Sequence, residues 1–281
     1  MAGILGTFID SDEQDWSVSE NQTLSYNLDD LEYETSQLTS AGEHADTIIR
    51  SVSFKSRGEK ISGMMRIPRS ENEVPGVLVL PGAGVTKEQQ TAIPTLLADM
   101  GYASITIDQR NLGAVDPEQD LELFSNGNEP VEYMMVHDAL MAADVLKAQS
   151  EVSDDIAMLG LSNGGRFAII ATAIDPEIKG VVTISTAGYN IDTIGKSEFV
   201  DEEDYIFYSS IDPDNYLDMI TPRRFVMFHS FNDSIIPYEL AQRSFDKAQE
   251  PKVFYGVEGS THGYNPLVDM GLEEELELMF H

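Results

Sequence analysis

Six short, predominantly apolar runs recur along the chain, and stretches with helical character separate them. Apolar runs of this length are typical of strands that are covered on both faces. The alternation of strand and helix predicts an α/β fold with a mostly parallel central sheet, right-handed crossovers and helices on both faces. The predicted strands are Val77–Leu80, Ala103–Ile107, Ile156–Leu161, Val181–Ile184, Phe225–Phe228 and Val253–Val257, and the predicted helices are 86–99, 130–149, 163–174 and 237–248.

The regions that flank this pattern differ in character. Residues 47–55 and 60–67 alternate apolar and polar side chains, which predicts an antiparallel hairpin before the first parallel strand. An amphipathic stretch at 266–280 predicts a last helix that packs across the sheet. Residues 1–46 are acidic and polar, so we expect an acidic extension or linker there and one α/β domain over residues 47–281.

The chain is strongly acidic, with 17 Lys and Arg against 49 Asp and Glu and a net charge of −32. No basic residue precedes Arg50 and none follows Lys252, yet the middle of the chain is acidic as well. Such a charge repels phosphate backbones and anionic lipids, which excludes nucleic acid as an expected partner. The acidity serves either as a solubilising surface or as an adaptation to high salt, and we favour the halophilic interpretation.

Several classes of protein are disfavoured by what the sequence lacks. There is no cysteine, which excludes disulfides, thiol nucleophiles, iron–sulfur clusters and cysteine-ligated zinc. No apolar stretch reaches the eighteen or so residues that span a bilayer. We expect a chain that is soluble as given, either cytoplasmic, or exported or anchored through a segment missing from its N-terminus.

The most informative motif is Gly160-Leu-Ser162-Asn-Gly164, which lies between an apolar strand and a helical stretch. In a G-x-S-x-G turn the serine occupies a strained position that lifts its oxygen clear of the backbone, and the glycines avoid clashes with the neighbouring strand and helix. An ordinary serine in a glycine-rich turn is the alternative. We interpret Ser162 as a nucleophile because the context is correct on both sides.

A serine hydroxyl needs a general base near neutral pH. His262 lies in a glycine-bounded loop after the last predicted strand, at the sheet edge where catalytic groups collect in parallel α/β folds. His262 is therefore the predicted base, and a turn histidine that caps the final helix is the alternative. The remaining histidines lie in the extension, in a helix, at a strand end and at the last residue, and they are His44, His137, His229 and His281.

The predicted acid that orients the base is Asp233, which lies just after the penultimate strand and just before a helix. Its loop should adjoin the loop that carries His262, and the chain order Ser, Asp, His favours this role. A helix N-cap is the alternative role for an aspartate in such a loop. The acidic region upstream supplies the fallback candidates Asp204, Asp212 and Asp214.

An oxyanion needs hydrogen-bond donors next to the nucleophile. The backbone N–H of Asn163 follows Ser162 directly, at the start of a helix whose dipole favours negative charge. A second donor is expected from the glycine-containing loop 81–84, where we assign the N–H of Ala83. A plain turn is the alternative for that loop.

Together these segments resemble the α/β-hydrolase superfamily, and most closely the dienelactone-hydrolase-like and prolyl-oligopeptidase-like serine hydrolases. The resemblance covers about residues 47–280. The chain differs from the dienelactone hydrolases proper because it lacks their cysteine nucleophile. Pro81 stands where many relatives have histidine, and Asn111 where they have glycine. The segments that carry it are Gly160–Gly165, Phe231–Pro237, Ser260–Tyr264 and Asp108–Gly113.

The resemblance implies a hydrolase with Ser162 as nucleophile, His262 as base and Asp233 as acid, and it implies no cofactor or metal. We expect it to cleave small-molecule carboxylic esters through an acyl-enzyme, with residues 187–222 as a possible short lid. A serine peptidase that acts on short or N-acylated peptides is the nearest alternative. A noncatalytic binding protein on a hydrolase fold is an alternative of another class, and the sequence leaves the oligomeric state open.

Overall fold

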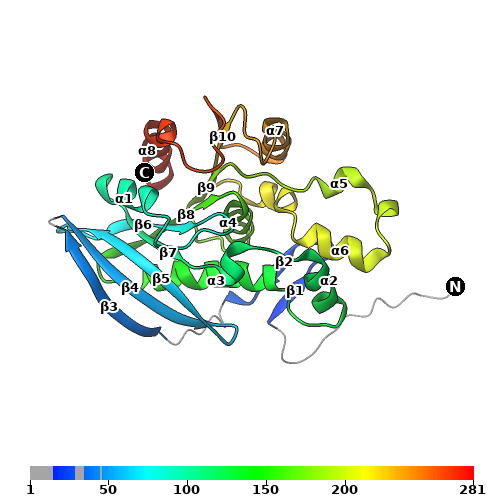
Figure 1. Ribbon diagram of the computed structural model, residues 1–281, viewed down its shortest axis with the longest axis horizontal. Helices are drawn as coiled ribbons and strands as arrows, with labels where there is room; N and C mark the ends of the chain where they lie inside the picture. Colours follow the sequence, from blue (N-terminus) through cyan, green and yellow to red (C-terminus); the bar gives the residue numbers. More distant parts are fainter. Residues whose placement is uncertain (1–14, 29–34, 45) are drawn as a thin grey trace.

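The computed structural model describes residues 15–28, 35–44 and 46–281, and its main feature is a single nine-stranded sheet (Figure 1). The strand order is β11-β10-β9-β8-β6-β7-β5-β4-β3, with parallel pairing from β11 to β7 and antiparallel pairing from β7 to β3. The bounds are β3 (Thr35–His44), β4 (Thr47–Ser56), β5 (Glu59–Pro68), β6 (Val74–Leu80), β7 (Ala103–Ile107), β8 (Val152–Leu161), β9 (Gly180–Ile184), β10 (Arg224–Ser230) and β11 (Lys252–Val257).

Helices cover both faces of this sheet. On β6, Val77 and Val79 face the cluster that contains α1 and α8, whereas Leu78 and Leu80 face the cluster that contains α3, α4 and α7. This alternation with a period of two is what a strand buried on both sides requires. The helices are α1 (Ala92–Asp99), α2 (Pro117–Ser125), α3 (Val131–Lys147), α4 (Asn163–Ile174), α5 (Ile191–Ile194), α6 (Glu202–Ser210), α7 (Tyr238–Lys247) and α8 (Asp269–Phe280).

The predicted fold class is confirmed: all six predicted apolar runs lie within the parallel strands β6 to β11, and β4 and β5 form the predicted hairpin. The first predicted helix, 86–99, begins only at Ala92. Residues before it form turns instead, because the N–H of Lys87 donates to the Asp108 carboxylate at 2.8 Å and holds this segment over the end of β7. Helix α2 and the short 3-10 helix η2 (Arg110–Gly113) were not predicted.

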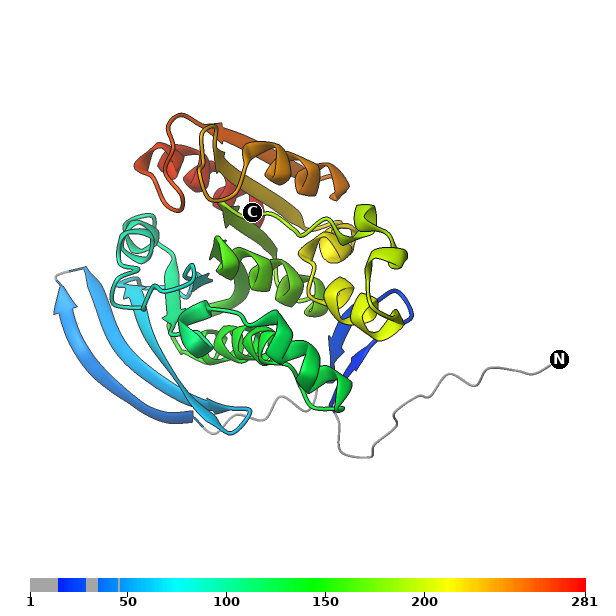
Figure 2. The same ribbon diagram turned by 45° about the vertical axis from the view of Figure 1, so that its right-hand side comes forward.

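The described part of the acidic extension is folded onto the domain (Figures 1 and 2). Strands β1 (Trp16–Val18) and β2 (Leu24–Tyr26) form a small antiparallel hairpin, and β3 completes the edge of the large sheet against β4. The N–H of Leu24 donates to the Tyr216 hydroxyl at 2.7 Å. The division at residue 46 stays a prediction, but β1, β2 and β3 are not parts of a linker, because apolar side chains such as Leu24 are buried in the main core.

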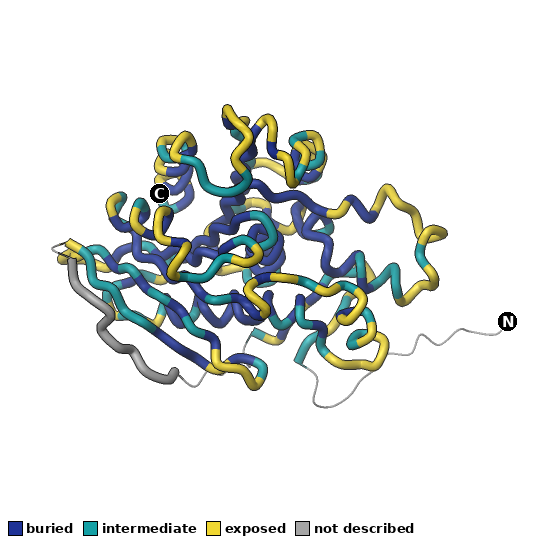
Figure 3. Tube along the Cα trace, in the orientation of Figure 1, coloured by how far each residue is buried: buried dark blue, intermediate teal, exposed yellow. Residues whose placement is uncertain are grey.

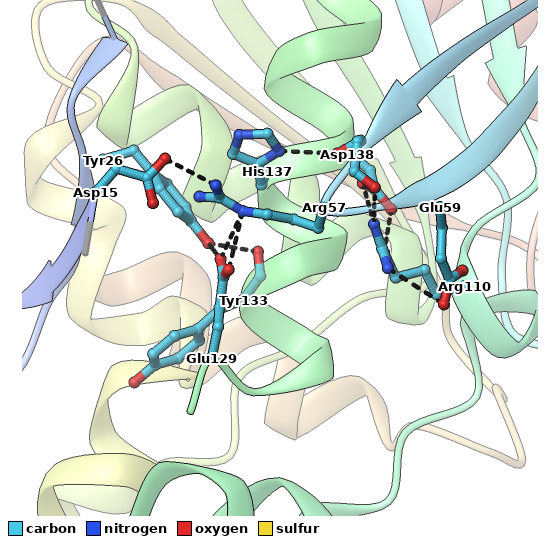
Figure 4. Close-up of polar contacts among 10 residues, drawn as sticks. Asp15, Tyr26, Arg57, Glu59, Arg110, Glu129, Tyr133, His137 and Asp138 are labelled. Atoms are coloured by element: carbon cyan, nitrogen blue, oxygen red, sulfur yellow. Dashed lines mark hydrogen bonds and ion pairs between the residues drawn. The ribbon is translucent and has the colours of Figure 1, made fainter. Parts of the chain in front are cut away.

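A polar network fastens the hairpin to α3, as Figure 4 shows. Arg57 lies between the carboxylates of Asp15 and Glu129 at 2.7 and 2.9 Å. The Tyr26 hydroxyl donates to the Tyr133 carbonyl at 2.8 Å. Partial burial of these charges is compensated by direct pairing, so the network fixes where the hairpin docks.

The possible lid, residues 187–222, divides into an exposed part and a buried part (Figure 3). Residues 192–201 are almost all exposed and include the short 3-10 helix η3 (Lys196–Glu198). The following α6 and η4 (Pro213–Met219) contribute Phe207 and Tyr216 to the core. Over the described ranges, no helix is both long enough and apolar enough to cross a membrane.

Candidate active site

Ser162 forms the turn between β8 and α4, with φ 49° and ψ −119°. Two glycines permit this close turn: a Cβ on Gly160 would lie 2.4 Å from the Gly164 carbonyl oxygen, and a Cβ on Gly164 would lie 2.4 Å from the Leu80 carbonyl oxygen. The N–H of Ser162 donates to the Ile184 carbonyl at 2.9 Å and ties the turn to β9. The serine is therefore held at the C-terminal edge of the parallel strands.

The imidazole of His262 connects Ser162 to Asp233. Its Nε2 lies 2.8 Å from the Ser162 Oγ, and its Nδ1 lies 2.9 Å from the Asp233 Oδ2. An ionised carboxylate only accepts hydrogen bonds, so Nδ1 carries the proton and Nε2 is free to accept the serine hydroxyl. The Asp233 side chain is fully buried, whereas the His262 side chain is 24% exposed. The arrangement can take a proton from a serine and stabilise the resulting imidazolium.

The Asp233 carboxylate is held in its ionised form by the loop that follows β10. Burial would raise its pKa, but hydrogen bonds from the Ile236 and Ile235 N–H groups and from His262 hold the pKa below its ordinary value. Both backbone donors reach Oδ1, at 3.0 and 2.9 Å. The carboxylate therefore keeps both its charge and its orientation towards the imidazole.

The loop after β6 lies directly against the nucleophile. A Cβ on Gly82 would lie 3.4 Å from the Ser162 Cβ, so the loop backbone passes the serine at van der Waals distance. The structure gives the Ala83 N–H no acceptor among the described residues. Asn163 is the first residue of α4, so its N–H has no partner within the helix. The Asn163 N–H thus lies directly after Ser162 in the chain, and the Ala83 N–H lies in the loop that passes Ser162 in space.

Known proteins resemble this chain in both sequence and fold. Residues 61–198 match the Dienelactone hydrolase family model. The structure aligns with acetyl xylan esterase 1 from Thermoanaerobacterium sp. JW/SL YS485 at a TM-score of 0.72 and 16% identity, covering 89% of this chain and 90% of that chain. It aligns with Est1E from Butyrivibrio proteoclasticus at a TM-score of 0.64 and 17% identity, covering 82% and 98%. The fold is that of the α/β-hydrolases.

Curated relatives match smaller parts of this chain. The "Putative hydrolase YtaP" of Bacillus subtilis (strain 168) is 25% identical over 153 residues, which cover 51% of this chain and 50% of that protein. The 2,6-dihydropseudooxynicotine hydrolase of Paenarthrobacter nicotinovorans is 28% identical over 120 residues, which cover 42% and 30%. The chain therefore spans half or less of the curated relatives it matches. The predicted resemblance to serine hydrolases of the α/β-hydrolase superfamily is confirmed.

Residues that sequence reasoning missed hold the loop that carries His262 in place. The Ser230 Oγ donates to the Thr261 carbonyl at 2.7 Å, and the Gly263 N–H donates to the Ser185 Oγ at 2.9 Å. These two contacts lie on either side of His262 in the chain. Ser230 is the last residue of β10 and Ser185 directly follows β9, but nothing in their local sequence marks them, because their partners are about 30 and 80 residues away.

Other histidines that the sequence offered lie apart from Ser162. The His137 ring bonds to the Ser56 hydroxyl at 2.8 Å, and burial lowers its pKa to about 4. His229 is buried beneath the acid loop, where its Nε2 donates to the Ile236 carbonyl at 2.9 Å. His281 ends the chain after α8, and the side chain of His44 lies outside the described residues.

The fallback acids serve other parts of the structure. Asp212 accepts hydrogen bonds from the Tyr189 and Ile191 N–H groups, both at 3.0 Å. Asp214 pairs with Lys247 at 2.8 Å, and Asp204 lies in the first turn of α6. None of the three forms a hydrogen bond or ion pair with a histidine in the described part of the chain. Nor do the described residues include a group of three or more His, Asp or Glu side chains placed to hold a metal ion.

Proposed function

We propose that this α/β-hydrolase is a serine hydrolase that cleaves carboxylic esters through an acyl-enzyme. The observation that carries the proposal is the unbroken series of contacts from Ser162 through His262 to Asp233, at 2.8 and 2.9 Å. A noncatalytic binding protein would have no need to hold a carboxylate, an imidazole and a strained serine in this order.

The geometry supports the following mechanism. The Ser162 Oγ attacks the ester carbonyl carbon while His262 Nε2 takes the hydroxyl proton, and Asp233 stabilises the imidazolium without taking the proton itself. The N–H groups of Asn163 and Ala83 stabilise the oxyanion. As the tetrahedral intermediate collapses, the C–O bond to the alcohol breaks and His262 gives its proton to the leaving alkoxide. Water then attacks the acyl-enzyme by the reverse sequence of proton transfers and releases the carboxylic acid and free Ser162.

Two observations favour small, uncharged esters as substrates over peptides. The aligned structures are named as esterases, among them an acetyl xylan esterase from Paenibacillus sp. R4. The net charge of −32 disfavours anionic substrates at the molecular surface.

The test compares p-nitrophenyl acetate with the matching p-nitroacetanilide, using the wild type and Ser162→Ala. We expect turnover of the ester at a kcat/KM at least about 100-fold above that of the anilide, and loss of about three orders of magnitude or more in Ser162→Ala. Ser234→Ala is the matched control, because Ser234 is exposed one residue after Asp233. Full activity of Ser162→Ala would overturn the proposal, and a preference for the anilide would favour the peptidase alternative.

The acidic surface supports a second, independent proposal about working conditions: the molecule is adapted to high salt. Two of the nine arginines, Arg110 and Arg166, are buried in pairs with Asp138 and Glu132. These two guanidinium groups are paired with carboxylates inside the protein, and only Arg110 also reaches an exposed carboxylate, that of Glu59 at 3.5 Å. Repulsion among the surface carboxylates should therefore be strong at low ionic strength and screened at high ionic strength.

A further inference from the structure

We propose that the side chain of Asn163 is a positioning group that couples the two halves of the oxyanion site. The inference rests on the proposed function, because it concerns the two N–H donors assigned to that reaction. Those donors belong to different segments: one starts α4, and the other lies in the loop after β6. Oxyanion stabilisation depends on their relative placement, since donors act within about 2.7–3.1 Å of the oxyanion.

The carboxamide of Asn163 reaches from the elbow to the segment that supports the loop after β6. Its Nδ2 donates to the Gly113 carbonyl at 2.6 Å. Gly113 adopts φ +73°, and a Cβ there would lie 3.4 Å from the Ala83 Cα, so its backbone packs directly on Ala83. The preceding carbonyl, of Leu112, accepts the Gly84 N–H at 2.7 Å. The side chain of Asn163 is therefore bonded to the same turn that holds the Ala83–Gly84 peptide.

This supporting turn has an unusual backbone. Asn111 and Leu112 both have left-handed conformations, with φ 48° and 50°, although neither is glycine. Such conformations cost free energy and persist where the surroundings fix them. Gln109 adds a second bond, because its Nε2 donates to the Pro81 carbonyl at 2.7 Å. The turn thus contacts the loop after β6 at both of its ends and the elbow through Asn163.

A buried ion pair fixes the orientation of the Asn163 carboxamide. The Arg166 Nη1 donates to its Oδ1 at 2.5 Å, which leaves the NH2 group to face Gly113. The Arg166 Nη2 in turn donates to Glu132 at 2.6 Å and to the Ile211 carbonyl at 3.1 Å. The ring of Tyr189 lies 4.1 Å from the guanidinium carbon. The amide cannot rotate without breaking a charge-assisted bond in the interior.

Two variants separate the bond to Gly113 from the bond to Arg166. Asn163→Asp keeps an acceptor for Arg166 but has no donor for the Gly113 carbonyl, and Asn163→Ala removes both bonds without adding charge. We expect both variants to lower kcat on p-nitrophenyl acetate by about 10- to 100-fold, less than the 100- to 1000-fold typical for a deleted donor. KM should change less than about threefold, because the ground-state ester does not yet carry the oxyanion charge.

The inhibition constants of two ketones distinguish a positioning role from a general effect on folding. The Ser162 Oγ adds to the carbonyl carbon of a trifluoromethyl ketone as its proton passes to His262, and the adduct is a tetrahedral oxyanion. The corresponding methyl ketone is not attacked and stays trigonal. The inhibition constant of the trifluoromethyl ketone should rise by the same factor as kcat falls, and that of the methyl ketone should stay within about twofold. The matched control is Thr186→Val, which removes the 3.0 Å bond to the Ser162 carbonyl but touches neither loop 81–84 nor 109–113.

The outcomes distinguish this inference from the proposed function. Unchanged trifluoromethyl ketone affinity in Asn163→Asp and Asn163→Ala, with Ser162 still essential, would overturn the positioning role alone. A Thr186→Val variant that loses trifluoromethyl ketone affinity as strongly as Asn163→Ala would also overturn it, since any disturbance of the elbow would then suffice. Activity that survives in Ser162→Ala would instead overturn the proposed function itself.

Discussion

Asp233 combines two tasks at the scale of single residues, because its carboxylate both anchors its own loop and faces His262. Oδ1 accepts the N–H groups of Ile235 and Ile236, while Oδ2 lies closest to the imidazole. Oδ1 also lies 3.1 Å from the His262 Nδ1, so both oxygens accept hydrogen bonds, and the residue is sensitive to replacement by an amide of the same shape.

Asp233→Asn should lower kcat/KM on p-nitrophenyl acetate by about 10³- to 10⁴-fold. The amide can keep its oxygen on the backbone N–H groups, which directs its NH2 towards the His262 Nδ1. That bond moves the imidazole proton to Nε2, where it can no longer accept the Ser162 hydroxyl proton. Steady-state kinetics on p-nitrophenyl acetate measure this loss. Asp212→Asn is the control, because Asp212 is also a buried aspartate. A fully active Asp233→Asn together with an inactive Asp204, Asp212 or Asp214 variant would show that the acid is another residue.

The contacts of Ser162, His262 and Asp233 could be anticipated because each residue lies in the turn or loop that follows a parallel strand, and the C-terminal ends of these strands lie at the same edge of the sheet. Local sequence was sufficient there. The side-chain contact of Asn163 could not be anticipated. The segment Asp108–Gly113 carries part of the family resemblance, but nothing in it indicates that the Gly113 carbonyl accepts a carboxamide 50 residues away. Supporting contacts of this kind depend on loops that only the folded sheet brings together.

At the scale of secondary-structure elements, the β1–β2 hairpin shows how composition concealed structure. The acidic, polar character of residues 1–46 favoured the prediction of an extension. Three apolar side chains are nevertheless enough to dock the hairpin on the domain. Trp16, Leu24 and Tyr26 all pack against the main cluster. Alternation over only three residues per strand is too short to separate from chance in a polar segment.

Tyr216→Phe tests the hairpin's attachment, because it removes the hydroxyl that accepts the Leu24 N–H and donates to the Ser210 carbonyl. An unsatisfied buried N–H costs about 1–3 kcal/mol, so the free energy of unfolding should fall by about that amount. Urea denaturation measures it, and limited proteolysis should cut faster within residues 15–28. Tyr205→Phe is the control, because the Tyr205 hydroxyl forms no hydrogen bond with another described residue. Equal stability of both variants would show that the hairpin contributes nothing at this contact.

Helix α3 begins against a buried carboxylate from α2. Asp120 accepts the N–H groups of Val131 and Glu132 at 2.8 and 3.1 Å, yet burial raises its pKa from 3.8 to about 6. A folded-state pKa above the ordinary value means that ionised Asp120 destabilises the folded state above about pH 6. The cost disappears as the pH falls from about 6 towards 4, because the folded protein then binds the proton more tightly than the unfolded chain.

Asp120→Asn removes this charge and keeps one acceptor for the helix N-terminus. The Tm of the variant minus the Tm of the wild type should therefore increase as the pH rises from about 4 to 7. Using the difference cancels other titrating groups, such as His137, whose lowered pKa acts in the opposite direction below about pH 6. Differential scanning calorimetry at four or five pH values measures it. A difference that stays flat or shrinks with rising pH would contradict the assignment of a raised pKa.

At the scale of the whole molecule, the dominant feature is the net charge of −32 that the chain carries. Folding brings the carboxylates together, whereas the unfolded chain can separate them, so repulsion lowers the free energy of unfolding. The mostly parallel sheet and its two helical layers followed from the alternation of apolar runs and helical stretches, whereas the order of the strands was not predicted. The edge strand β3 did not follow, because residues 35–44 have few apolar side chains to mark a strand.

Salt should stabilise this molecule clearly. The Debye length falls from about 10 Å at 0.1 M to about 3 Å at 1 M, so most of the repulsion should be screened between these conditions. We expect the Tm to rise between 0.1 and 1 M KCl and to rise similarly in NaCl. Sulfate is unsuitable as a test, because its exclusion from protein surfaces stabilises proteins in general. A Tm that does not change across the KCl series would identify the acidity as a device for solubility.

Covalent labelling tests the central claim, that Ser162 is a nucleophile activated by His262, most directly. A fluorophosphonate probe should add one equivalent to the native protein, and peptide mapping by mass spectrometry should locate the adduct on Ser162 alone. Ser234→Ala should label as the wild type does, and His262→Ala should label at least about 100-fold more slowly, because an unassisted serine hydroxyl is a weak nucleophile. An adduct on Ser185 or Ser230, or ester hydrolysis that continues after Ser162 is fully modified, would contradict the account.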